Sequence, residues 1–98
     1  MKRLRLDDAA KAELLHETRY LETERSGSGR KFREAVEDVF MRIRRNPMAG
    51  REDELGCRRR RIAGFKFSVV YREEPTEIVV FVIRPDHRDA GYWHARAR

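Results

Sequence analysis

Residues 78–83 constrain this chain more than any other stretch, because all six are apolar and most are β-branched: Ile78, Val79, Val80, Phe81, Val82 and Ile83. A strand with water on one face alternates apolar and polar residues, whereas an uninterrupted apolar run indicates a strand buried on both faces. We therefore expect residues 78–83 to form a central strand of a sheet.

The segment that follows, residues 84–93, brings basic and aromatic side chains together. Arg84, His87 and Arg88 supply the basic groups, and Tyr92 and Trp93 supply the aromatic ones. This mixture suits the binding of phosphates and stacked bases, or docking onto a protein partner. Because residues 84–93 directly follow a strand that is predicted to be central, this segment is the first candidate for a functional site.

The N-terminal half predicts a short strand followed by two helices. Residues 2–6 alternate between leucine and basic residues, which indicates a strand with one wet face at the edge of a sheet. Asp7 occupies an N-cap position for a first helix that runs to about Arg25. After a turn at residues 26–29, a second helix ends before Pro47. Its apolar stripe recurs at helical spacing and consists of Phe32, Val36, Val39 and Ile43.

The C-terminal half predicts three strands joined by short turns. We expect them at residues 58–62, 65–72 and 78–83, with turns at residues 63–64 and 73–76. Strands with such short connections form an antiparallel meander, and the N-terminal strand can join the same sheet.

The predicted fold is therefore α+β, with the order β-α-α-β-β-β in a single domain over residues 1–98. The helix hairpin packs on one face of a small antiparallel sheet to bury its apolar stripe. The other face stays partly open, and its exposed strand positions are candidates for a binding surface.

The charge of the chain indicates an anionic partner. Lysine and arginine total 23 against 17 acidic residues, which gives a net charge of +6 and a pI of about 10.1. A small basic domain attracts nucleic acid, an anionic membrane or an acidic protein. Residues 58–61 are four consecutive arginines, which on a strand must point alternately to the two faces.

Cysteine and histidine usage argues against a disulfide or a metal. Cys57 is the only cysteine, and the three histidines are widely spaced. We expect no metal and no cofactor. No apolar stretch approaches the roughly 20 residues that span a bilayer, so we also expect a cytosolic protein.

Four features of the chain are similar to those of a known family: the order of helices and strands, the sequence FKFSVVY at residues 65–71, the apolar strand, and the sequence HRDAGYW at residues 87–93. In these features the chain resembles the RelE/ParE superfamily of toxins. These are the toxin halves of bacterial type II toxin–antitoxin pairs. The resemblance covers nearly the whole chain. RelE-like members are ribosome-dependent endoribonucleases that cut mRNA, whereas ParE-like members inhibit DNA gyrase.

The resemblance also implies site residues. For a RelE-like enzyme, Arg59 and Arg61 match two basic positions on the sheet, and Arg88 matches an arginine after the last strand. A third-strand arginine is replaced by Ser68, which cannot stabilise an anion in the same way. The terminal tyrosine of that site falls near Tyr92 or His94.

His87 is a further candidate acid or base, because its unperturbed pKa lies near neutrality. Tyr92 and Trp93 have two interpretations, as groups that contact a target or as groups that seal the core. The aromatic residues of the third strand are interpreted as core.

The Gly-Tyr-Trp ending resembles ParE-like sequences and favours a gyrase inhibitor. The alternatives are a RelE-like mRNA endoribonuclease acting with the ribosome, and a non-toxic nucleic-acid or protein-binding module. The expected partner is a cognate antitoxin with an acidic, partly disordered segment, in a hetero-oligomer with the toxin. We expect antitoxin or target contacts from Arg59, Arg61, Arg84, Arg88, Tyr92 and Trp93.

Overall fold

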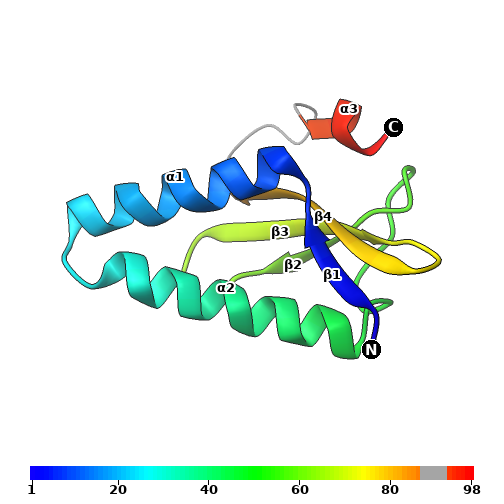
Figure 1. Ribbon diagram of the computed structural model, residues 1–98, viewed down its shortest axis with the longest axis horizontal. Coiled ribbons are helices and arrows are strands. Elements are labelled where there is room, and N and C mark those ends of the chain that lie inside the picture. Colours follow the sequence, from blue (N-terminus) through cyan, green and yellow to red (C-terminus); the bar gives the residue numbers. More distant parts are fainter. Residues whose placement is uncertain (87–92) are drawn as a thin grey trace.

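The sheet contains four strands in the order β1-β4-β3-β2, and the predicted central strand, β4, lies inside it. The computed structural model describes residues 1–86 and 93–98 (Figure 1). Along the chain the elements are β1 (Arg3–Leu6), α1 (Asp8–Glu24), α2 (Ser28–Arg45), β2 (Arg58–Arg61), β3 (Phe67–Glu73), β4 (Glu77–Pro85) and α3 (His94–Ala97). The α+β class and the predicted order from β1 to β4 are confirmed.

The sheet is mixed, which corrects the prediction of an antiparallel sheet. β2, β3 and β4 form the expected antiparallel meander, but β1 pairs with β4 in parallel, from Arg3 opposite Glu77 to Leu6 opposite Val80. A hairpin turn fixes the direction of two neighbouring strands, and no such turn links β1 to β4. β1 is joined to β4 through α1, α2, β2 and β3, and the residue pattern of a four-residue strand does not encode the direction of pairing across so long a connection.

The helix hairpin covers one face of the sheet (Figure 1). α2 carries the buried apolar stripe that the sequence predicts, and Phe32, Val36 and Ile43 are fully buried. Phe32 makes edge-to-face contacts with Phe65 and Phe67, with ring centroids 5.2 and 5.1 Å apart. This packing forms the larger of two apolar cores.

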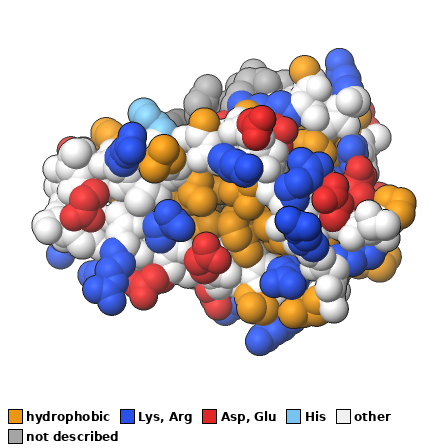
Figure 2. All heavy atoms as spheres, viewed as in Figure 1, with side chains coloured by type: hydrophobic (Ala, Val, Ile, Leu, Met, Phe, Trp, Pro, Cys, Tyr) orange, Lys and Arg blue, Asp and Glu red, His pale blue; other side chains and the backbone are white. Residues whose placement is uncertain are grey.

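α1 is less deeply buried than α2, and only Ala10 in it is fully enclosed. Leu4, Leu6, Leu14 and Leu21 from β1 and α1 are partly buried against the larger core. Figure 2 shows the side of the molecule that carries α1 and α2, with apolar side chains in the middle and charged side chains around them. This side therefore leaves some apolar surface accessible to a partner.

The turn between α1 and α2 is closed by Glu22. Its carboxylate accepts hydrogen bonds from the backbone N–H groups of Gly27 and Gly29, at 3.0–3.1 Å. Free N–H groups at a helix start need such an acceptor. A Cβ atom on Gly29 would lie 2.7 Å from the carbonyl oxygen of Thr18, so the two helices approach closely only because this residue is glycine. α2 accordingly begins at Ser28, inside the segment predicted as a turn.

A second, smaller core lies on the sheet face opposite α1 and α2, which we call the second face. It contains Cys57, Val70, Val79, Phe81, Val82, Trp93 and Ala97. A β-bulge lets it form: Val70 pairs with Val82 but Tyr71 pairs with Val80, so Phe81 is an extra residue in β4. Part of the face that was expected to be open is therefore covered by α3, a short helix that the sequence did not predict.

Ionic and backbone contacts hold α3 in place. Arg96 lies 3.0 Å from Glu13 of α1 and donates to the carbonyl of Phe81 at 3.1 Å. Arg72 of β3 donates to the carbonyl of Ala97 at 2.8 Å. The Glu13 carboxylate also accepts the backbone N–H of Ile83 at 3.1 Å, so one side chain joins α1, β4 and α3.

Within the residues described, no helix has both the length and the apolar character to cross a membrane.

Candidate binding site on the second sheet face

The second face gathers arginines from two strands. Arg59 is paired with Val70 and Arg61 with Ser68, so both project to the second face as the alternation of the strand predicts. Ser68 is paired in turn with Arg84 of β4, which places Arg84 on the same face. Arg59 and Arg61 are exposed, whereas Arg84 is 4% exposed. Three of the predicted site residues therefore come together on one surface.

A carboxylate occupies part of this basic surface. The Ser68 hydroxyl, which is fully buried, donates a hydrogen bond to Asp86 Oδ1. The other oxygen of Asp86 lies 3.5 Å from the guanidinium of Arg61. Arg61 is well exposed, so this ion pair adds little stability. Its effect is local, because a negative charge stands where an anion would approach Arg61.

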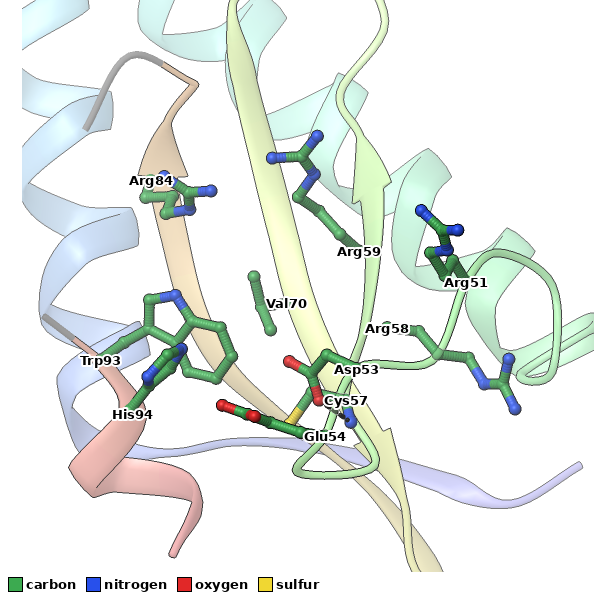
Figure 3. Close-up of a pocket in the computed structure, with 10 residues that line it drawn as sticks. All are labelled: Arg51, Asp53, Glu54, Cys57, Arg58, Arg59, Val70, Arg84, Trp93 and His94. Carbon is green, nitrogen blue, oxygen red and sulfur yellow. Dashed lines mark hydrogen bonds between the residues drawn. The ribbon is translucent and has the colours of Figure 1, made fainter. Parts of the chain in front are cut away.

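A pocket of about 400 Å³ opens beside this arrangement (Figure 3). Its walls come from the loop before β2, from β2, β3 and β4, and from the C-terminal segment. The lining residues are Arg51, Asp53, Glu54, Cys57, Arg58, Arg59, Val70, Arg84, Trp93 and His94. Among the described residues that line it, four arginines against two carboxylates give the pocket an excess of positive charge.

The side chains divide this pocket into a basic part and an aromatic part. Figure 3 shows Arg59 and Arg84 on one side, with Trp93 and His94 on the other and Val70 between them. The rings of Trp93 and His94 meet edge to face, with centroids 4.7 Å apart. The pocket can therefore accept a group that is anionic at one end and apolar along its flank.

Trp93 belongs to the smaller core, and only 4% of its surface is exposed. This burial agrees with the interpretation that it seals the core. Its indole N–H, however, has no hydrogen-bond acceptor in the part of the chain that the structure describes. In Figure 3 the indole nitrogen is on the side of the ring that faces Arg84 and Arg59. Trp93 is thus a core residue in the pocket wall whose buried donor is unsatisfied.

Cys57 is an inert part of the pocket wall. It is 1% exposed, and burial raises the pKa of its thiol to about 11. A thiol needs to be ionised to act as a nucleophile, so Cys57 is unsuited to covalent chemistry near neutral pH.

Tyr71, on the opposite face, donates its hydroxyl hydrogen to the carbonyl oxygens of Pro47 and Ala49, and burial raises the pKa of this hydroxyl. The interpretation of Tyr71 as a core residue is confirmed.

Three predicted site residues, His87, Arg88 and Tyr92, lie outside the described residues. Conversely, the loop before β2 contributes to the pocket although the sequence did not predict it, and its residues Arg51, Asp53 and Glu54 reach the wall. The aspartate at position 53 is the sequence feature that could have indicated an ordered loop, because aspartate side chains commonly accept hydrogen bonds from nearby backbone N–H groups. In the structure the Asp53 carboxylate accepts two such hydrogen bonds, both at 2.8 Å.

The sequence profile of the family described as "ParE toxin of type II toxin-antitoxin system, parDE" matches residues 4–91 of this chain. The chain belongs to the ParE toxin family. This ParE toxin also resembles a chain of the solved structure titled "Chromosomal ParDE TA system from P. aeruginosa", with 24% sequence identity and a TM-score of 0.66. The match covers 87% of the toxin described here and 96% of the other chain, and at this identity it shows a shared fold. No curated protein matches the sequence significantly.

Proposed function

We propose that this ParE toxin inhibits DNA gyrase through protein–protein contacts, in the cytoplasm, and that a cognate antitoxin neutralises it by covering the second face. Membership of the ParE family supports the toxin role and implies an antitoxin partner. The gyrase target and the mode of neutralisation go beyond family membership and rest on the surface of the toxin.

The arrangement of Ser68, Asp86 and Arg61 is the observation that favours a gyrase inhibitor over an mRNA endoribonuclease. Attack of a ribose 2′-hydroxyl on a phosphate requires a base, an acid and cations that stabilise the developing charge. Ser68 offers no cation, and it is buried and bonded to Asp86. Asp86 also places a negative charge beside Arg61, at 3.5 Å. This geometry opposes the binding of an RNA phosphate at that point.

Protein contacts are supported by the surface itself. The side that carries α1 and α2 exposes apolar side chains between charged ones (Figure 2), a combination typical of protein interfaces. On the second face, Arg59 and Arg61 stay exposed. An acidic, partly disordered antitoxin segment would fold along this face and neutralise its charge, in a hetero-oligomer.

The test is to induce the toxin without its antitoxin and to follow DNA breaks and mRNA integrity in parallel, soon after induction. The proposal expects broken or relaxed DNA with intact mRNA, and loss of supercoiling activity when purified gyrase is mixed with purified toxin. Addition of the cognate antitoxin should restore activity. Cleaved mRNA with intact DNA would overturn the proposal and identify Arg59 and Arg61 as part of a nuclease site.

A further inference from the structure

The Trp93 indole N–H is a buried donor that lacks an acceptor. The side chain is only 4% exposed, and among residues 1–86 and 93–98 nothing accepts its hydrogen bond. Leaving a buried donor unsatisfied costs free energy, and such groups in native proteins often serve a function. Trp93 lines the pocket of the second face, but its indole nitrogen is itself buried in the free toxin. An acceptor on a bound partner can therefore satisfy the N–H once the ring shifts toward the pocket.

A cation stands across the pocket from this donor. Arg59 is exposed, and the part of the chain that is described offers its guanidinium no ion pair. In Figure 3, Val70 lies between Arg59 and Trp93, and the indole nitrogen is on the edge of the ring that faces Arg59 and Arg84. A neutral donor, a cation and an apolar contact are the groups that recognise an acidic side chain with an aliphatic stem.

The remaining walls favour a single carboxylate over a nucleic acid. Asp53 and Glu54 also line the pocket, and Asp86 lies on the same sheet face. The arginines of the pocket outnumber these carboxylates, so a single negative charge can be held beside Arg59, whereas a polyphosphate chain running across the surface would also have to pass the carboxylates. A cavity of about 400 Å³ with Val70 in its wall instead has room for one or two amino-acid side chains.

We propose that this pocket seats one acidic side chain of the antitoxin, with its carboxylate accepting the Trp93 N–H and pairing with Arg59, and its methylene groups against Val70. The proposal rests on the proposed neutralisation of the toxin by an acidic antitoxin segment. It adds that a single aspartate or glutamate anchors that segment.

The decisive variant is Trp93→Phe, which removes the N–H and keeps most of the aromatic surface. Trp93→Phe also shrinks a ring packed in the smaller core, so its melting temperature should fall by a few degrees for reasons of packing alone. Its affinity for the purified cognate antitoxin, measured by calorimetry, should fall roughly 10- to 150-fold, the range of one hydrogen bond to a charged group. Arg59→Gln should weaken binding similarly, and Arg33→Gln, an exposed arginine of α2, should not.

A double-mutant cycle identifies the anchor. Each acidic residue of the antitoxin is changed to its amide, and binding to wild-type and Trp93→Phe toxin is compared. One antitoxin position should weaken binding to wild-type toxin and have little further effect with Trp93→Phe. Additive effects at every position would overturn the proposal, as would tighter binding of a single-stranded RNA oligonucleotide than of the antitoxin.

Failure of this proposal is distinguishable from failure of the proposed function. If wild-type and Trp93→Phe toxins bind the antitoxin equally and both inhibit gyrase, the anchor is wrong and the function stands. If gyrase is unaffected while the cycle reveals one coupled carboxylate, the anchor stands and the target is wrong.

Discussion

Glu13 is predicted to be the residue whose loss most selectively frees α3 from the sheet. Its carboxylate accepts the backbone N–H of Ile83 at 3.1 Å and the guanidinium of Arg96 at 3.0 Å. Glu13→Ala leaves the Ile83 N–H without this acceptor, which costs about 1–3 kcal/mol. The ion pair is partly exposed and adds up to about 1 kcal/mol. We expect a total loss of about 2–3 kcal/mol, or roughly 10–20 °C in melting temperature for a domain of this size.

Urea unfolding of Glu13→Ala, Glu13→Gln and wild type measures this loss. Glu13→Gln keeps a carbonyl oxygen for the Ile83 N–H and should lose only about 1 kcal/mol, because the charge alone is removed. Trp93 is the only tryptophan, so its fluorescence reports directly on the segment that α3 belongs to. Its emission should move to longer wavelength in Glu13→Ala before global unfolding.

Glu37 on α2 provides the control, because it is exposed and its side chain makes no ion pair or hydrogen bond within the described residues. Glu37→Ala should change stability by less than about 0.5 kcal/mol. The reasoning fails if Glu13→Ala is no worse than this control. It also fails if Glu13→Gln is as damaging as Glu13→Ala, since the charge and not the oxygen acceptor would then be decisive.

Three further predictions concern the cores and the helix turn. Gly29→Ala should destabilise the protein by about 2 kcal/mol in urea unfolding, because its Cβ would lie 2.7 Å from the Thr18 carbonyl oxygen; an unchanged midpoint would show that the helices separate freely. Phe32→Ala should cost about 3–5 kcal/mol by the same assay, since Phe32 is fully buried, and a cost below about 1 kcal/mol would contradict the packing described. Burial raises the pKa of Cys57 from 9.0 to about 11, so the stability gained from its neutral thiol is complete below pH 9 and is lost as the pH rises through about 11. Wild-type toxin should therefore lose about 2–3 kcal/mol more than Cys57→Ala between these pH values, and parallel stability curves for the two proteins would contradict the raised pKa.

The helix hairpin and the meander could be predicted because each depends on a local period. Phe32, Val36 and Ile43 lie at helical spacing and are buried as expected. The alternation of side chains along a strand predicts, from the sequence alone, that Arg59 and Arg61 share one face of β2, and their pairing with β3 confirms this. These features need no knowledge of distant parts of the chain.

The features that the sequence did not reveal all depend on contacts between distant residues. The parallel pairing of β1 joins Arg3 to Glu77, and no local turn encodes it. α3 has only four residues, which are too few for a recognisable period, and its position depends on Arg96 meeting Glu13. The pocket likewise combines a loop, three strands and a C-terminal segment, so its lining could be found only once these elements were placed together.

The place of β4 in the sheet has a consequence for synthesis of the toxin. β4 is the last strand among the residues that the structure describes, yet it lies between β1 and β3, and its residues belong to both apolar cores. The N-terminal strand therefore waits for a neighbour that leaves the ribosome about 70 residues later. Contacts so distant along the chain form late, so we expect the domain to fold in one step only once β4 has emerged from the ribosome. A chain that still lacks β4 would then present neither of the two apolar cores nor the pocket in completed form.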